Sequence, residues 1–403
     1  MTLYLDYNST TPLENGVVET ISVALREEWG NPSSSHSFGK VAKVSIEKAR
    51  RNLAVMINGN DNDIIFTSGG TEANNLVIFS AVESYRKWVE TQKNVPSDKP
   101  HIITSDVEHD AILLPLKHLK SRGDIDVSFV SAAPSGSIKV EDVISRIKTR
   151  TCLITIMFAN NETGVIMPIT DLGRAISKTN ELRVKKRLFK ILFHTDAAQA
   201  IGKVPVDVEV SKVDYMTIVG HKFYGPRIGC IYARDVGVTT PLYPIIFGGG
   251  QERGFRPGTE NTAMIAGLGK AAELVIENLD KYMKHFICIK EYLLLRLQEE
   301  FGDSVVFNCH NDENHILPNT CNISLLGMSL TGSDILAACK TVVASIGAAC
   351  HSQNKPSSIL ISSGVSPELA RSAVRLSLGR ETSKEDIDLA TADLKQAVES
   401  LKK

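Results

Sequence analysis

The sequence predicts an α/β fold, with a large domain built on a mostly parallel seven-stranded sheet and a smaller α+β C-terminal domain. Two observations lead to this prediction. Between about residues 45 and 235, short β-rich apolar runs alternate with stretches of helical length. After about residue 260, one long helical pattern is followed by short strand-like runs. Alternation of the first kind is typical of a parallel sheet whose two faces are both covered by helices.

The elements can be placed along the chain in order. The candidate strands of the large domain are 64–67, 101–104, 127–130, 152–158, 191–195, 215–219 and 229–233, and stretches such as 71–87 and 171–179 have helical length. The later helix spans about 261–301, strand-like runs follow near 322–325 and 342–345, and Ser383 caps a final helix with Asp386 as its partner. We therefore expect a large domain over 15–264 and a small domain that joins 1–14 to 265–403.

Composition limits the classes of protein to which the chain can belong. It has 403 residues, of which 43% are hydrophobic and 23% charged, as expected for a globular protein with two domains. The formal net charge is -1, and we expect neither a nucleic-acid partner nor a membrane-surface partner because both usually accompany a basic bias. The clean apolar run at 153–159 is too short to cross a bilayer.

The cysteines and the first residues of the chain indicate where in the cell the protein is expected. The chain has 7 cysteines, an odd number, without C-x-x-C spacing, so neither a disulfide framework nor a metal site is expected. Residues 1–11 show no basic stretch that leads into an apolar one. We therefore expect the cytosol, unless a leader has been removed.

Three polar segments follow predicted strands, where α/β sheets bind their ligands. The Gly70-Thr71 turn opens a helix and suits a phosphate, although a capped turn looks the same. Asp196 could bind a metal, cap a helix or pair with a cation, and Lys222 could be a desolvated nucleophile or a surface residue. Together they match the needs of pyridoxal phosphate, which are a lysine for the aldehyde, an acid for the pyridine nitrogen and a phosphate pocket.

Ordered blocks along nearly the whole chain extend this match. By them the sequence resembles the class-V aminotransferase-like, fold-type I pyridoxal-phosphate enzymes, and within these the cysteine desulfurase and selenocysteine lyase group. The blocks are Leu-Asp-Tyr-Asn at 5–8, Asn-Pro-Ser-Ser at 31–34, Ser-Gly-Gly-Thr-Glu at 68–72, Val-Glu-His at 107–109, Asn-Asn-Glu-Thr-Gly at 160–164, His-Thr-Asp-Ala-Ala-Gln at 194–199, Gly-His-Lys at 220–222, Arg-Pro-Gly-Thr-Glu-Asn at 256–261 and Ser-Leu-Gly-Arg at 377–380.

The resemblance implies roles around the cofactor ring. Lys222 would carry pyridoxal phosphate as a Schiff base and would remove the substrate α-proton. Asp196 would face the pyridine nitrogen, and Gln199 would face the ring hydroxyl oxygen. His109 would stack on the ring and assist proton transfer.

The resemblance also implies how the phosphate is held. Gly70, Thr71 and His221 would bind it within one subunit, and Thr259 would reach the phosphate of a partner subunit, which implies a homodimer. One position departs from the pattern, because desulfurases often read Ser-Gly-His-Lys where this chain has a valine before Gly-His-Lys at 220–222. Either a phosphate-binding hydroxyl is lost, or Thr217 replaces it.

Substrate recognition and the reaction are implied in the same way. Asn161 and Arg375 would bind the carboxylate of a small amino-acid substrate, with arginine suited by its planar fork. Cys350 aligns with the loop that holds the catalytic cysteine, and it would either attack the chalcogen or donate a proton to it. Gly-Ala-Ala-Cys-His-Ser at 347–352 resembles the selenocysteine-cleaving branch, whereas housekeeping desulfurases typically read Gly-Ser-Ala-Cys-Thr-Ser.

The predicted reaction is therefore the decomposition of L-selenocysteine to L-alanine and selenide, with a protein that accepts the selenide as a further partner. The alternative is a cysteine desulfurase that gives L-alanine and an enzyme persulfide for iron–sulfur clusters or thiolated RNA.

Overall fold

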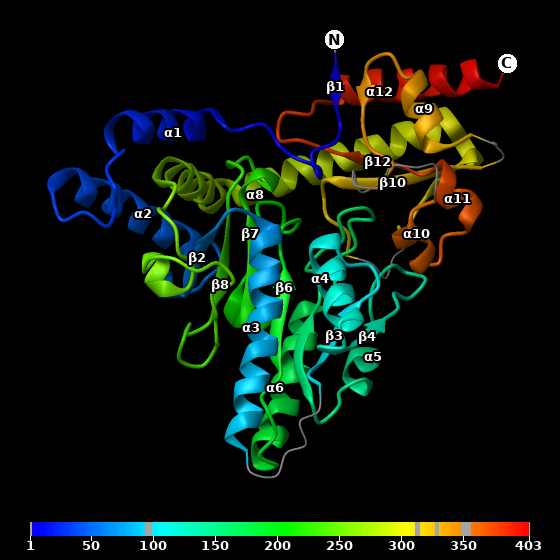
Figure 1. Cartoon of the computed structure of the whole chain (residues 1–403). Helices are drawn as coiled ribbons and strands as arrows, with labels where there is room; N and C mark the ends of the chain where they lie inside the picture. Colours follow the sequence, from blue (N-terminus) through cyan, green and yellow to red (C-terminus); the bar gives the residue numbers. More distant parts are fainter. Residues whose placement is uncertain (1, 93–98, 311–314, 327–329, 348–355, 403) are drawn as a thin grey trace.

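A seven-stranded sheet forms the centre of the protein (Figure 1). The computed structural model describes residues 2–92, 99–310, 315–326, 330–347 and 356–402. The strand order is β2-β8-β7-β6-β5-β3-β4, and only the pairs that β8 makes with β2 and β7 are antiparallel within this sheet. The mostly parallel seven-stranded sheet is thus confirmed. Its strands are β2 (Ile64–Thr67), β3 (His101–Ser105), β4 (Asp126–Val130), β5 (Thr151–Thr155), β6 (Leu192–Asp196), β7 (Tyr215–Val219) and β8 (Gly229–Ala233).

Helices cover both faces of this sheet, because successive strand residues point to opposite sides. Ile102 of β3 belongs to the core under α3 and α4, whereas Ile103 belongs to the core under α1, α2, α6 and the start of α8. The helices of this part are α1 (Asn15–Glu27), α2 (Ser37–Met56), α3 (Gly70–Thr91), α4 (Asp110–Ser121), α5 (Val140–Ser145), α6 (Ile169–Lys185), α7 (Val208–Ser211) and α8 (Thr262–Phe301).

A separate core lies in the C-terminal part, and the first residues of the chain join it. Leu3 and Leu5 pack there with Phe286, Leu293 and Leu394. Two small sheets build this part, the parallel pair β1-β11 and the antiparallel sheet β12-β10-β9. The elements are β1 (Leu3–Tyr4), β9 (Val305–Phe307), β10 (Thr320–Leu325), α9 (Gly332–Ala338), β11 (Val342–Val343), α10 (Ser358–Ser362), α11 (Pro367–Ser372), β12 (Val374–Ser377) and α12 (Lys384–Leu401).

Helix α8 connects the two parts and is shared between them (Figure 1). Val275 in its first half packs into the core of the large sheet, whereas Tyr282 in its second half packs into the C-terminal core. A boundary between residues 264 and 265 therefore falls inside a continuous helix. The division into 15–264 and 1–14 with 265–403 stays a prediction. The point at which α8 passes from the core of the large sheet to the C-terminal core lies further along the helix than residue 264.

The predicted elements agree with the structure except at some ends. The run 152–158 forms a strand only to Thr155, and the residues after it enter the loop that lines the site described below. The final helix has the capping box expected from Ser383 and Asp386. Helices α1 and α2 were not predicted, and 171–179 is part of the longer α6. None of the helices in the described ranges combines the length and apolarity that a membrane crossing needs.

Candidate active site

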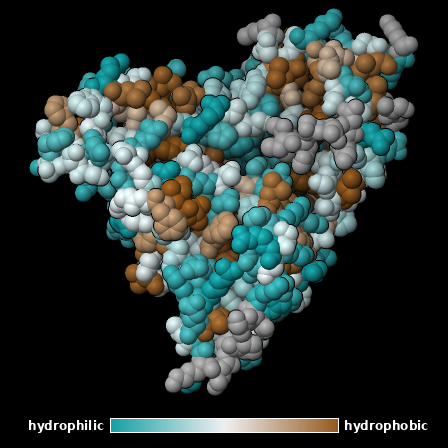
Figure 2. Space-filling model, viewed as in Figure 1, coloured by the Kyte–Doolittle hydropathy of each residue, from teal (hydrophilic) through white to brown (hydrophobic). Residues whose placement is uncertain are grey.

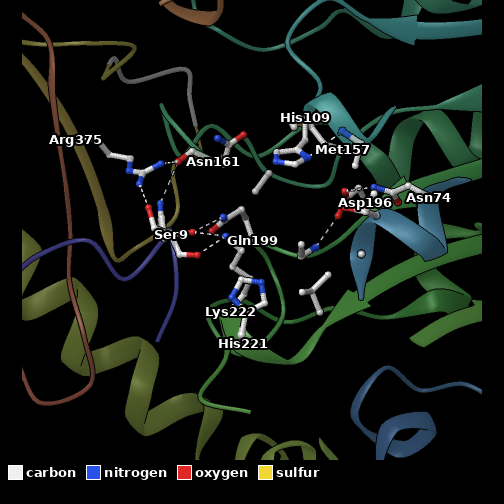
Figure 3. A pocket seen from close by; sticks show the side chains of 17 residues that line it. Ser9, Asn74, His109, Met157, Asn161, Asp196, Gln199, His221, Lys222 and Arg375 are labelled. Carbon is white, nitrogen blue, oxygen red and sulfur yellow. Dashed lines mark hydrogen bonds between the residues drawn. The ribbon is translucent and has the colours of Figure 1, made fainter. Parts of the chain in front are cut away.

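A cavity of about 270 Å³ lies beyond the carboxyl ends of the parallel strands β5, β6 and β7 (Figure 3). Its walls come from the N-terminal arm, the starts of α3 and α4, the segments after those three strands, and β12. The sequence prediction had placed nine of these wall residues in the site. The lining residues are Asn8, Ser9, Gly70, Thr71, Asn74, His109, Ala111, Met157, Ala159, Asn161, Asp196, Ala198, Gln199, Val219, His221, Lys222 and Arg375.

Lys222 enters the cavity from a tight turn directly after β7. The turn is a short 3-10 segment, Gly220–Lys222, and a Cβ at Gly220 would lie 2.4 Å from the carbonyl oxygen of Pro226. Only glycine fits there, so the backbone before the lysine is tightly constrained. The Lys222 Nζ donates to the backbone oxygens of Asn8 (2.7 Å) and Ser9 (2.8 Å), which hold the amine at the cavity wall.

Asp196 ends β6 and points to the same cavity (Figure 3). Its Oδ1 accepts a hydrogen bond from the backbone N–H of Ala198 (3.0 Å), and its Oδ2 accepts one from Asn74 Nδ2 (2.7 Å). The side chain of Asn74 comes from α3, one helical turn after Gly70. Asp196 is therefore held between a strand end and a helix, with both oxygens oriented by donors.

The start of α3 provides a site for an anion. Its N-cap residue is Gly69, which supplies no side-chain cap to the first N–H groups of this 22-residue helix. A Cβ at Gly70 would lie 2.7 Å from Val219 Cγ2, so the backbone there approaches the strand more closely than another residue would allow. His221 lies nearby, and burial together with the charge of Lys222 lowers its pKa to about 4. The imidazole is therefore neutral near neutral pH.

Arg375 lies on the opposite wall, on β12, and is 2% exposed. Its Nη1 donates to the backbone oxygen of Asn161 (2.9 Å), and its Nη2 donates to Asp6 Oδ1 (2.5 Å) and Ser9 Oγ (2.8 Å). Two buried atoms at this wall, Arg375 Nε and Asn161 Oδ1, have no hydrogen-bond partner among the described residues. A buried donor without a partner is costly, and a carboxylate bound here would satisfy the guanidinium Nε.

Behind Gln199 lies a second buried amine. Lys203 Nζ donates to Gln199 Oε1 (2.7 Å) and to Asn8 Oδ1 (3.2 Å), while Gln199 Nε2 donates to the backbone oxygen of Asn8 (2.9 Å). Burial, with the charges of Lys222 and Arg375, holds the pKa of Lys203 well below its usual range. The bond from Lys203 fixes which end of the Gln199 amide faces Asn8.

His109 begins α4 as its N-cap, with Nδ1 accepting from the backbone N–H of Ala111 (3.1 Å). The residue before it, Glu108, is fully buried. Its Oε1 accepts from Ser105 Oγ (2.6 Å) and the backbone N–H of Met157 (2.9 Å), and its Oε2 has no partner within the described ranges. Burial is the largest cause that raises the pKa of Glu108, to about 8.

This buried carboxyl predicts a pH dependence of stability. Unfolded Glu108 releases its proton near 4.5 and the folded residue near 8, so the folded state holds the extra proton between these values. The free energy of unfolding should therefore fall as pH rises from about 5 to about 8, by at most about 1.4 kcal/mol per pH unit. Urea unfolding across this range should show the slope in the parent protein and lose it in Glu108→Gln. The exposed Glu141 provides the matched control, since Glu141→Gln should retain the slope. Equal slopes in all three proteins would contradict a neutral Glu108.

A model of the family described as Aminotransferase class-V matches residues 3–389. The chain belongs to this family. It is 52% identical to the selenocysteine lyase of Rattus norvegicus, with 99% of this chain and 95% of the relative covered. It is 36% identical to cysteine desulfurase IscS of Dictyoglomus turgidum, with 99% and 95% covered. A solved NifS-like protein superposes with a TM-score of 0.86 at 31% identity and covers 99% of this chain and 100% of its own.

Class-V aminotransferases depend on pyridoxal phosphate, and the cavity wall fits that cofactor. The uncapped start of α3 suits a phosphate, Asp196 offers an oriented acceptor, and Lys222 offers an amine. On the far wall, Arg375 Nε and Asn161 Oδ1 have no hydrogen-bond partner among the residues that the structure describes, which leaves them available to a bound molecule. The fit therefore rests on the donor set and on unsatisfied buried atoms.

The structure does not bring every predicted site residue of this class-V aminotransferase into the cavity. Thr217 lies in β7 but is not a lining residue, and its hydroxyl donates to Asn74 Oδ1 (2.7 Å), so this arrangement does not support a phosphate contact by Thr217. Thr259 is exposed and lies outside the cavity lining. Cys350 lies outside the described residues.

Some residues at the site were missed by the sequence reasoning. Asn8 links Lys222, Gln199 and Lys203 through hydrogen bonds. It belongs to the Leu-Asp-Tyr-Asn motif at 5–8, and this motif was the signal that could have identified it. Asn74 could have been found from helical spacing, since it follows Gly70 by one turn and faces the same side. Lys203 gave no such signal, because a lysine after a predicted site reads as a surface residue.

Proposed function

We propose that this chain decomposes L-selenocysteine to L-alanine and selenide with the help of pyridoxal phosphate, with a thiol reductant as the source of the two electrons that convert the released selenium to selenide. The observation that carries the proposal is the identity of 52% over 99% of the chain to selenocysteine lyases, against 36% to cysteine desulfurases. Several vertebrate relatives with the former name share this level, including that of Homo sapiens at 52%. The desulfurase alternative therefore has weaker support.

In this proposal the wall residues hold the cofactor at three points. Lys222 Nζ would bind its aldehyde carbon, Asp196 would accept a hydrogen bond from the pyridine N–H, and the first N–H groups of α3 would bind its phosphate together with Thr71 and His221, all of which lie at the cavity wall. Gln199 would contact the ring hydroxyl oxygen, and His109 would cover the ring. The chemistry supplied by bound pyridoxal phosphate is the withdrawal of electrons from the substrate Cα, which lets the bond from Cβ to selenium break.

The remaining walls bind and orient the amino acid. The Nε of Arg375, which has no partner within the described part of the chain, would bind the substrate carboxylate, with the Asn161 side chain beside it. Asp6, Ser9 and the Asn161 backbone oxygen already hold the other guanidinium nitrogens, so the fork is oriented before the substrate arrives. Lys222 then takes the α-proton, a task that suits an amine at the cavity wall.

Cys350 is proposed to act on selenium, either by attack on the chalcogen or by donation of a proton to it. This role rests on the resemblance of 347–352 to the selenocysteine-cleaving branch. A selenol ionises more readily than a thiol, so the protonation state of the leaving atom is a second basis for selection between the two substrates.

The proposal also includes the assembly of the protein and its location in the cell. A homodimer, in which Thr259 reaches the cofactor phosphate of the partner, is consistent with an exposed Thr259 that does not line its own cavity. Exposed apolar side chains such as Val238 and Phe247, both 86% exposed, are available for such an interface. Figure 2 shows apolar patches on one face of the molecule and a hollow between its two upper lobes. A cytosolic location and a protein that accepts selenide complete the proposal.

The experiment is product analysis with purified holoprotein. Incubation with L-selenocysteine and excess thiol reductant should release L-alanine and selenide in equal amounts, and L-cysteine under the same conditions should release alanine more slowly. Amino-acid analysis measures the first product, and a selenide-trapping assay measures the second. Failure to form alanine from L-selenocysteine, in protein that has bound its cofactor, would contradict the proposal.

A further inference from the structure

A chain of buried side chains runs from Asp196 across the sheet, away from the cavity. Asn74 Nδ2 donates to Asp196 Oδ2 (2.7 Å), and Thr217 Oγ1 donates to Asn74 Oδ1 (2.7 Å). His194 Nε2 lies 3.1 Å from Thr217 Oγ1, and His194 Nδ1 lies 2.8 Å from Thr155 Oγ1. Apart from Asp196, which is 9% exposed, every member is fully buried, and the four contacts link α3 with β5, β6 and β7.

The hydrogen-bond directions in this chain follow from the chemistry of its members. Both Asp196 oxygens accept hydrogen bonds, so Asn74 must present its NH₂ group to Asp196 and its oxygen to Thr217. An amide oxygen only accepts, so Thr217 must donate its single proton to Asn74 and accept from the next member. His194 therefore carries its proton on Nε2, and the Thr155 hydroxyl donates to Nδ1. Each direction fixes the next one.

The protonation state of His194 agrees with this order. Burial lowers the pKa of His194 to about 4, although the charge of Asp196 opposes the shift. The ring is therefore neutral near neutral pH and has one donor and one acceptor nitrogen, as the chain requires. No direction along the chain can be reversed without leaving a buried donor facing a donor or an acceptor facing an acceptor, and such mismatches are costly.

We propose that Asn74, Thr217, His194 and Thr155 form a positioning relay that holds the Asp196 carboxylate toward the cofactor ring nitrogen. The relay rests on the proposed function in one respect, since it requires the ring nitrogen to face Asp196. The residues act through Asp196 and are positioning residues. Without the Thr217 proton, Asn74 Oδ1 loses its donor, so the amide is held at one end only and its hydrogen bond to the Asp196 carboxylate is less firmly oriented.

Thr217→Val tests the relay because valine has a similar shape without the hydroxyl. In the holoprotein we expect the visible absorption band of the bound cofactor to shift and the cofactor to leave about fivefold faster on dilution, the effect of one lost hydrogen bond. Thr217→Ser keeps the hydroxyl and should restore both properties. Asn74→Leu removes the donor itself and should show the same changes to a larger extent.

The matched control is Thr104→Val in β3. Thr104 is equally buried, but its Oγ1 has no partner among the described residues, so the loss of this hydroxyl breaks no hydrogen bond. Its band and its release rate should equal those of the parent. Thermal unfolding of each variant reports any general loss of stability.

The outcomes separate the relay from the proposed function. If the parent binds pyridoxal phosphate with a visible band and Thr217→Val matches Thr104→Val in band and release rate, the relay is overturned while the cofactor site stands. If Thr217→Val does not fold, the same comparison is made between Asn74→Leu and the parent. A parent that shows no cofactor band would overturn the relay together with the proposed function.

Discussion

Replacement of Lys222 by alanine should abolish turnover of the amino-acid substrate. The Lys222 Nζ is held at the cavity wall by the backbone oxygens of Asn8 and Ser9. In the proposed function this amine binds the cofactor aldehyde and moves the α-proton. Loss of the base alone should lower kcat by roughly 10²- to 10⁴-fold. Borohydride reduction followed by mass spectrometry should show the cofactor attached to the peptide that contains Lys222 in the parent, and no attachment in Lys222→Ala.

The control for this prediction is another lysine of the same chain. Lys178 on α6 is exposed and does not line the cavity, so Lys178→Ala should retain both turnover and attachment. A Lys222→Ala protein that still turns over substrate at the parent rate, or cofactor attached at another lysine, would show that the assignment of Lys222 is wrong.

Replacement of Arg375 by lysine should weaken substrate binding by about 10- to 100-fold, seen mainly in KM. The charge remains, but a lysine cannot reach the Asn161 oxygen, Asp6 and Ser9 while it also offers a donor to the substrate carboxylate. Hydrogen bonds to charged groups contribute about 1.5–3 kcal/mol, which sets the expected range. Steady-state kinetics on L-selenocysteine measure this effect.

Arg371 provides the comparison, since it lies on α11 close in sequence and is exposed. Arg371→Lys should leave KM unchanged. Retention of the bound cofactor in Arg375→Lys would show that the cavity has survived the substitution. An unchanged KM in that variant would mean that the substrate carboxylate binds elsewhere.

The sequence alone was enough to place residues that follow predicted strands at the edge of the sheet where the cavity lies. Asp196 and Lys222 follow short apolar runs, and parallel strands bring their carboxyl ends to one edge of the sheet, so the two meet at the cavity. Ser383 and Asp386 likewise lie close together along the chain, and their capping box formed as expected. Residues that lie close together in the sequence are placed by the local backbone structure, so their relative positions can be predicted from the sequence.

Contacts between distant segments could not be derived in this way. Asn8 meets Gln199 across 191 positions of sequence, and it does so because the N-terminal arm packs with the C-terminal core. Thr217 was considered for its hydroxyl, but sequence alone does not say which neighbour on α3 that hydroxyl reaches. Its partner Asn74 lies 143 positions away and was not considered. The buried network behind the site therefore needed the structure.

The central claim is that this cavity selects L-selenocysteine, and a competition assay tests it most directly. Purified holoprotein is given L-selenocysteine and L-cysteine in one vessel with excess thiol reductant, and selenide and sulfide are measured over time. We expect kcat/KM for L-selenocysteine to exceed that for L-cysteine, with selenide formed first. Equal or faster release of sulfide would contradict the claim and would favour the cysteine desulfurase alternative.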